Sequence, residues 1–155
     1  MHLKTLFIAA GLAAIFAAPA LAGSCPADKS GPDVRPMNNT PAAGVTDDVI
    51  GAVDLAKEPN ARADNRMLRL RKLVVQPGGV VPWHSHGNRP AIIYIISGTI
   101  EEYASTCSVP IVHKPGDVAT EHFGTAHWWK NTGKETVVLL SADFFPVQDE
   151  HPHTM

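Results

Sequence analysis

The sequence has little of what would place it in several common classes of protein. Its 155 residues contain 13 Lys and Arg against 15 Asp and Glu, and no basic run, which argues against nucleic acid or a lipid surface as a partner. No amphipathic stretch of about ten residues predicts a helix, and beyond the N-terminus no apolar run is long enough to span a membrane. These absences leave a small domain built from strands as the expectation.

The one long apolar run lies at the N-terminus. Residues 1–22 join a short positive head at Lys4, an apolar run from Leu6 to Ala18, and a small-x-small ending at Ala20-Leu21-Ala22. This pattern is typical of a secretory signal peptide cut after Ala22, with an uncleaved membrane anchor as the alternative. Cleavage leaves 155 − 22 = 133 residues with a formal charge of 12 − 15 = −3, enough for one domain. We therefore expect a secreted protein, periplasmic in a Gram-negative cell and away from the membrane after cleavage, and leave a homodimer open.

The chain has only two cysteines, Cys25 and Cys107, and both remain after cleavage. In an oxidising compartment they are expected to form one disulfide. A bridge that closes a loop of about 80 residues contributes roughly 4 kcal/mol in the chain-entropy model. Two alternatives stay open: both thiols remain free, or Ala22-Gly23-Ser24-Cys25 is a lipoprotein processing site, although the usual leucine is missing.

The remainder of the chain divides into an arm, a domain and a tail. Residues 23–65 form an N-terminal arm, within which residues 45–57 are either an edge strand or a short helix. Residues 66–147 form the domain, and residues 148–155 a polar tail that includes His151 and His153. Short β-type segments between glycine and proline turns predict an all-β sandwich or barrel. The expected strands are residues 66–76, 80–86, 91–97, 99–103, 109–113, 117–120, 127–130 and 136–145, with Pro77-Gly78-Gly79 as a turn.

Three histidines carry most of the functional signal. His84 and His86 alternate as they would on a strand, so both imidazoles fall on one face. His127 opens another apolar segment about forty residues later and meets them only if the sheet folds back on itself. Three neutral imidazoles that converge inside a barrel form a good site for a divalent transition metal.

The spacing around these histidines resembles the two motifs of a small single-domain cupin. The first motif is Gly78, five residues, His84-Ser85-His86, four residues, Ala91, six residues, Gly98. The second is Gly116, five residues, His122-Phe123-Gly124, two residues, His127, three residues, Asn131. There are two departures: Ala91 stands where the motif has a glutamate that usually acts as fourth ligand, and His122 stands where it has a proline.

The resemblance implies a double-stranded β-helix, or jelly-roll barrel, closed around a small-molecule cavity. It also implies that His84, His86 and His127 ligate a metal in that cavity. Ligand type does not decide among Fe, Mn, Zn, Ni and Cu. Without the motif's glutamate, the site lacks the carboxylate that would offset the charge of the metal.

Further residues are candidates for roles around the metal. Arg89 has the parity to point inward and bind an anionic group, although a solvated loop arginine is the simpler expectation. Glu121 could supply a proton near the mouth, again against the simpler expectation of a solvated turn carboxylate. His122 could replace the missing ligand or only line the rim, and His113 is expected on the strand surface. The expected cavity walls are Ile93, Ile95 and Trp129.

A cupin fold does not determine the chemistry that it supports. The first hypothesis is a metal-dependent oxidoreductase, similar to the three-histidine dioxygenases of the family, that acts on a small organic molecule. The second is a non-enzymatic periplasmic protein that binds a metal or a small ligand. A sugar isomerase or epimerase ranks third, because it would need an inward acid–base pair for which only Glu121 and His122 are candidates.

Overall fold

The computed structural model describes residues 23–147, so the expected signal peptide and polar tail lie outside the described residues. Two short 3-10 turns, η1 (Ala27–Lys29) and η2 (Leu55–Lys57), accompany the strands. Among residues 23–147, no helix has the length and apolar character that crossing a bilayer requires. The strands are β1 (Ala43–Asp54), β2 (Arg66–Ser85), β3 (Ala91–Ser97), β4 (Ile100–Ala104), β5 (Ile111–His113), β6 (Val118–Glu121), β7 (Ala126–Lys130) and β8 (Val137–Pro146).

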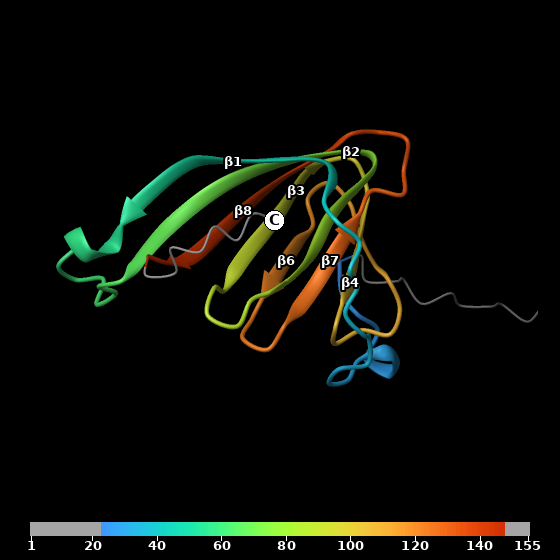
Figure 1. The fold of residues 1–155 in the computed structure, drawn as a ribbon, viewed down its shortest axis with the longest axis horizontal. Helices are drawn as coiled ribbons and strands as arrows, with labels where there is room; N and C mark the ends of the chain where they lie inside the picture. Colours follow the sequence, from blue (N-terminus) through green and yellow to red (C-terminus); the bar gives the residue numbers. More distant parts are fainter. Residues whose placement is uncertain (1–22, 148–155) are drawn as a thin grey trace, which may run out of the picture.

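These strands form one antiparallel sheet that rolls up into a nearly closed barrel (Figure 1). The strand order is β5-β4-β7-β2-β8-β3-β6, and β1 pairs with β2 beside this path. Neighbours in the sheet come from distant parts of the chain, as in a jelly roll. The expected all-β jelly-roll fold is therefore confirmed.

Strand β2 runs through the segment that the sequence predicts to be a turn. Its first part, up to Val75, pairs with β8, and its last part, from Val80, pairs with β7. The strand bends between them, where Gly78 has a φ of +77° and a Cβ on Gly79 would lie 2.8 Å from two backbone oxygens. The predicted turn at Pro77-Gly78-Gly79 is thus wrong: the glycines let one strand of 20 residues belong to both halves of the barrel.

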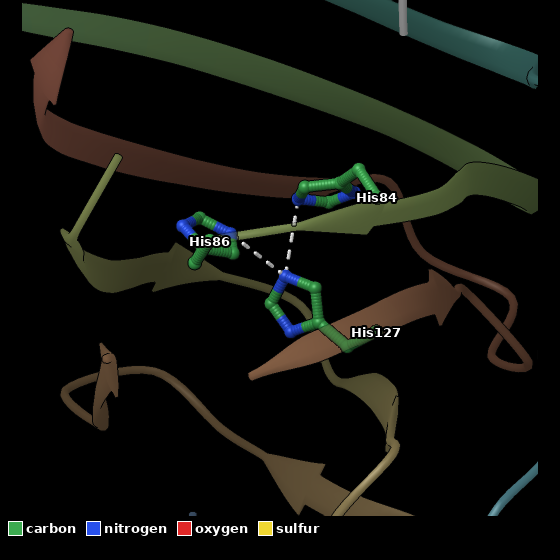
Figure 2. Close-up of side chains that lie close together, drawn as sticks. All are labelled: His84, His86 and His127. Carbon is green, nitrogen blue, oxygen red and sulfur yellow. Dashed lines mark hydrogen bonds between the residues drawn. The ribbon is translucent and has the colours of Figure 1, made fainter. Parts of the chain in front are cut away.

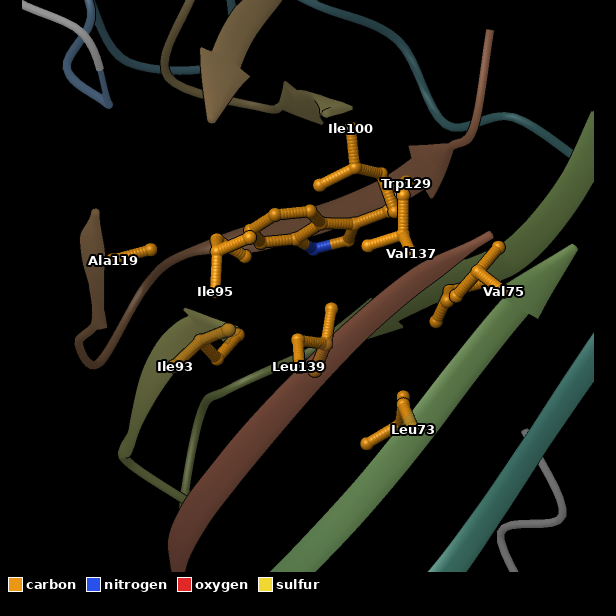
Figure 3. Close-up of a cluster of buried hydrophobic side chains, with 10 residues drawn as sticks. Leu73, Val75, Ile93, Ile95, Ile100, Ala119, Trp129, Val137 and Leu139 are labelled. Carbon is orange, nitrogen blue, oxygen red and sulfur yellow. The ribbon is translucent and has the colours of Figure 1, made fainter. Parts of the chain in front are cut away.

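The hydrophobic core lies between the two halves of the rolled sheet (Figure 3). Strand alternation sends every second side chain inward, as the burial of Leu73 and Val75 on β2 and of Ile93 and Ile95 on β3 shows. The core cluster comprises Leu73, Val75, Val81, Ile93, Ile95, Ile100, Ala119, Trp129, Val137 and Leu139.

The N-terminal arm contributes strand β1, so of the two interpretations of residues 45–57 the edge strand is correct. Asp54 pairs with Met67 and Val45 with Val75, along nearly the full first part of β2. The far ends of β1, β2 and β8 extend past the rest of the sheet (Figure 1). Val49, Ile50 and Val53 are about half exposed there.

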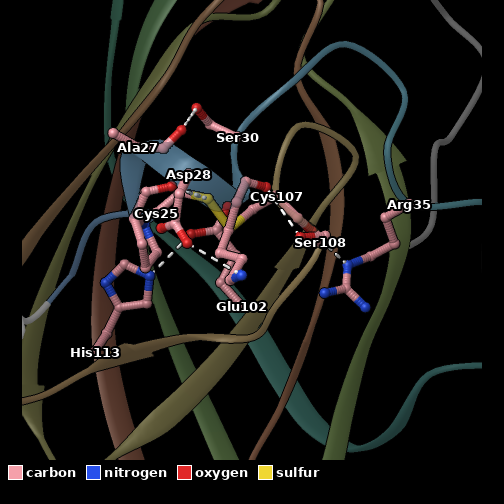
Figure 4. The surroundings of a disulfide bond; sticks show 11 residues. Cys25, Ala27, Asp28, Ser30, Arg35, Glu102, Cys107, Ser108 and His113 are labelled. Carbon is pink, nitrogen blue, oxygen red and sulfur yellow. Dashed lines mark hydrogen bonds and ion pairs between the residues drawn. A yellow bond between two sulfur atoms is a disulfide. The ribbon is translucent and has the colours of Figure 1, made fainter.

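A disulfide ties the start of the arm to the barrel (Figure 4). Cys25 and Cys107 are joined, as the sequence predicts, across 82 residues. Backbone hydrogen bonds flank the bridge: the Gly31 amide donates to Thr106 and the Ser108 amide to Lys29. Cys107 is fully buried with Ala104 and Ile111 in a small second cluster, so the arm covers this end of the barrel.

Candidate metal centre

The fold brings the three histidines named by the sequence to one point (Figure 2). His84 lies near the end of β2 and pairs directly with His127 of β7, which places their side chains on the same face. His86 follows the end of β2, where its amide donates to the Thr125 carbonyl. Nε2 of His127 lies 3.1 Å from Nε2 of His84 and 3.1 Å from Nε2 of His86.

Hydrogen bonds on the far side of each ring decide which nitrogen carries the hydrogen. Nδ1 of His84 lies 2.9 Å from the Pro82 carbonyl, and Nδ1 of His86 lies 2.8 Å from the Arg89 carbonyl. A carbonyl oxygen can only accept, so both Nδ1 atoms must donate, and each neutral ring presents a bare Nε2. Nδ1 of His127 lies 2.8 Å from Oε1 of Glu102, which has the same effect.

The three Nε2 atoms therefore direct lone pairs toward one another rather than hydrogen bonds. Burial, and to a smaller extent the electrostatic effect of His127, lower the pKa of His86 to about 4. Burial also lowers the pKa of His84, so neither His84 nor His86 is protonated near neutral pH. If all three rings are neutral, the lone pair on Nε2 of His127 repels those of His84 and His86, each 3.1 Å away, unless a cation lies between them.

The donor set fits a transition metal. Neutral imidazole suits Zn, Cu, Fe and Ni, and a spacing of 3.1 Å is compatible with two nitrogens that each lie about 2.1 Å from a shared ion. Three protein ligands leave further coordination positions for water or substrate, which is typical of a catalytic rather than a structural site. His84, His86 and His127 are thus the residues that would hold the metal.

Glu102 is a functional residue that the sequence analysis missed. Its side chain is buried and accepts from Nδ1 of His127 and from Nε2 of His113, both at 2.8 Å. Burial alone would raise the pKa of Glu102, but the hydrogen bonds from His113 and His127 lower it to about 2. An ionised carboxylate behind a metal-binding imidazole orients the ring and increases its basicity. The available signal was its parity with Ile100 and Ala104, which marks the buried face of β4.

His113 is also not where the sequence analysis expects it. Its side chain is fully buried rather than on the strand surface, and it stacks on Trp129 with ring centres 4.7 Å apart. The reason is register: Ile100 of β4 pairs with His113 of β5, so His113 faces the same interior as Ile100 and Glu102. His113, Glu102 and His127 form a continuous buried chain of hydrogen bonds that ends at the metal-binding nitrogens.

Glu121 is buried as well, against the simpler expectation of a solvated turn carboxylate. It is only 2 % exposed, and its Oε2 lies 3.5 Å from Nδ1 of His127. Glu121 of β6 pairs directly with Ala91 of β3, the position where the cupin motif has its glutamate. A carboxyl group is therefore present on the neighbouring strand, beside the position at which the motif's glutamate is missing. Burial, opposed by the charge of His127 and assisted by that of Glu102, raises the pKa of Glu121 to about 7.

The other candidates separate into inward and outward residues. Arg89 turns inward, where its Nη1 lies 3.1 Å from the buried Asp143, so the solvated-loop expectation is wrong. His122 is exposed and belongs to neither group of side chains that could hold a metal ion.

A cavity opens beside His84 and His86 and is bounded by five apolar side chains, Ile93 and Trp129 among them. The cavity is small and opens to solvent through its mouth. Ile95 is fully buried in the core and does not line this cavity. Arg71 and Ser141 are its two polar wall residues besides the histidines.

Comparison with known proteins agrees with this geometry. Residues 71–143 match the Cupin domain family model, and this segment includes all three histidines. Together with the jelly roll, this match supports a single-domain cupin. No curated protein matches the sequence.

Solved structures show the same fold at low sequence identity. A conserved protein with a double-stranded β-helix domain from Klebsiella pneumoniae is 21 % identical, with a TM-score of 0.51 over 75 % of this chain and 85 % of its own. The Cupin_2 domain of an XRE family transcriptional regulator from Enterobacter cloacae is 11 % identical, with a TM-score of 0.50 over 67 % and 99 %. The Schizosaccharomyces pombe Cnp3 cupin domain is 21 % identical, with a TM-score of 0.46 over 50 % of this chain; only 55 % of that domain is covered.

Proposed function

We propose that this protein is an exported metal-dependent oxidoreductase of the dioxygenase type, which acts on a small organic molecule at its three-histidine site. The observation that carries the proposal is the convergence of three imidazoles, with Nε2 of His127 at 3.1 Å from Nε2 of both His84 and His86, beside a cavity lined by His84 and His86. When bound there, a redox-active divalent metal such as iron would supply Lewis acidity and electron exchange with dioxygen.

The chain's own residues divide the remaining work. Glu102 keeps the proton of His127 on Nδ1, so that Nε2 stays available as a ligand. The apolar walls around Ile93 and Trp129 exclude water and hold the apolar part of a substrate. Glu102 and Glu121 place two buried carboxyl groups behind His127, where they can offset the charge of a divalent ion that the missing motif glutamate would otherwise balance.

Export is part of the proposal and rests on two features. The first 22 residues carry the pattern of a secretory signal peptide, and the Cys25–Cys107 disulfide suits an oxidising compartment such as the periplasm. N-terminal sequencing of protein recovered from the periplasm tests it: we expect Gly23 as the first residue. An intact N-terminus on cytoplasmic protein would contradict it.

A binding protein without catalysis is the second candidate, and one observation favours it. The cavity is lined by Arg71 and two histidines as its only ionisable groups among the described residues, so no carboxyl group faces a bound molecule. The same observation weakens the isomerase or epimerase hypothesis, because Glu121 lies behind His127 and His122 is exposed.

Metal stoichiometry and oxygen consumption test the proposal together. The wild-type protein should bind one equivalent of a divalent metal, and His86→Ala should lose tight binding because a three-ligand site becomes a two-ligand site. His122→Ala is the matched control, since it removes an exposed histidine of the same domain. Unchanged stoichiometry in His86→Ala would refute the ligand assignment. Oxygen consumption by the Fe(II)-loaded protein with a panel of thiols and aromatic diols supports the oxidoreductase; stoichiometric binding without turnover favours the binding protein.

A further inference from the structure

Three arginines surround a buried aspartate, Asp143, and a partly buried one, Asp47, at one wall of the barrel. The carboxylate of Asp143, which is 1 % exposed, accepts from Nε and Nη2 of Arg69 at 2.9 and 2.7 Å. Nη1 of Arg89 lies 3.1 Å from Asp143, and Nε of Arg71 lies 3.5 Å from it. Arg71 also forms an ion pair with Asp47. We call these five residues the arginine cluster.

The charges in the arginine cluster do not balance. Three guanidinium groups face two carboxylates, which leaves 3 − 2 = +1 at this wall; Arg71 is buried, whereas the side chains of Arg69 and Arg89 are 15 % and 17 % exposed. Burying a net charge is costly unless a partner of opposite sign neutralises it. The nearest metal-ligand side chains, His84 and His86, are neutral imidazoles and cannot provide that partner.

The orientation of the arginine cluster decides whether positive or negative groups line the cavity. Arg71 lines the cavity, whereas neither Asp47 nor Asp143 does. Beside it, Ser141 lines the same wall, and its Oγ accepts from Nη2 of Arg71 at 3.4 Å. A hydroxyl that accepts in this way keeps its own hydrogen to donate. The cavity thus offers a cation and a hydroxyl donor on one side and the histidine nitrogens on another.

We propose that this cavity binds a small organic carboxylate, with its carboxylate group against Arg71 and Ser141 and its apolar part against Ile93 and Trp129. The inference rests on the proposed function for its second anchor, because an oxygen of the same ligand would reach the metal held by His84 and His86. One excess charge and two adjacent donors suit a carboxylate better than a phosphate dianion, which would bring a second charge. The cavity is small, which limits the ligand to a small acid.

Paired ligands of equal size test the proposal. The Co(II)-loaded protein is titrated with 2-oxobutanoate and 3-methyl-2-oxobutanoate and, separately, with their amides, following the Co(II) absorption bands and the heat of binding. We expect each acid to bind at least tenfold more tightly than its amide. Equal affinity of acid and amide on metal-loaded protein would overturn the inference and leave the proposed metal site standing.

Variants then locate the carboxylate site. Arg71→Gln should weaken acid binding at least tenfold and Ser141→Ala several-fold, with metal stoichiometry unchanged in both. Lys72→Gln is the matched control: it removes one positive charge from the exposed neighbour of Arg71 and should leave acid binding unchanged. Ser141→Ala keeps the test decisive if Arg71→Gln does not fold. Weakening by Lys72→Gln equal to that by Arg71→Gln, or no weakening by Ser141→Ala, would refute the site.

Failure of the proposed function has a different signature. If the wild-type protein binds no metal, the same titrations on metal-free protein still report the carboxylate site through the acid–amide difference and its dependence on Arg71 and Ser141. If acid and amide bind equally well to both the metal-free and the metal-loaded protein, the carboxylate site is refuted while the proposed metal site stands.

Discussion

Replacing Glu102 by glutamine tests whether the buried carboxylate controls the metal site. Glu102 accepts one hydrogen bond from His113 and one from His127, each at 2.8 Å. Glutamine has nearly the same shape but only one accepting oxygen, and its NH2 group can only donate. One of the two histidines must therefore face a donor. If that histidine is His127, its hydrogen moves to Nε2, which can then no longer bind a metal.

The expected loss of metal affinity follows from the effect of comparable histidine-orienting residues in other metal sites. Loss of a residue that orients a metal-binding histidine typically costs 10- to 100-fold in affinity, or about 1.4 to 2.7 kcal/mol. The metal-free protein should also lose about 1 to 3 kcal/mol of stability, because a buried polar group is left without its partner. Both effects arise although Glu102 itself is not expected to touch the metal.

Competition titration against a chromophoric chelator measures the affinity, and urea unfolding of the metal-free protein measures the stability. Glu101→Gln is the matched control, because Glu101 is the neighbouring strand residue and bonds Tyr103 rather than a histidine. A Glu102→Gln protein that binds metal as tightly as the wild type would show that the Glu102–His127 contact does not set the tautomer, and the reasoning would fail.

Two further predictions concern stability. A Cys25→Ser and Cys107→Ser double variant should lose about 4 to 5 kcal/mol of unfolding free energy, because the bridge closes a loop of 82 residues. Urea unfolding with and without reductant measures this loss, and a wild-type protein whose stability does not fall in reductant would refute the prediction. Burial raises the pKa of Glu121 from 4.5 to about 7, so its contribution to folding is present below pH 4.5 and is lost as pH rises through 7. In the metal-free protein, Glu121→Gln should therefore gain up to about 3 kcal/mol relative to the wild type between pH 4.5 and 8, measured as the difference in unfolding free energy; a pH-independent difference would contradict it.

Local pattern was enough to predict the strands and the three histidines. Runs of β-type residues along β3 and β4, with a glycine turn between them, predict short strands whatever their neighbours are. The His-x-His spacing of His84 and His86 puts both rings on one face, and the likeness to the cupin motifs adds His127. The turn at Pro77-Gly78-Gly79 failed because glycines that end a strand and glycines that bend one look the same in sequence.

What surrounds the histidines was decided by the tertiary structure. Glu121 stands beside Ala91 only because β6 pairs with β3 in that register, and His113 meets Glu102 only because β5 pairs with β4. Register shifted by one residue would turn each of these side chains to the opposite face. The buried charge of Arg71 depends likewise on partners that β1 and β8 supply. Residue type and spacing along one strand thus determine which groups can bind a metal, whereas contacts between strands far apart in the chain determine the charge and the proton positions around it.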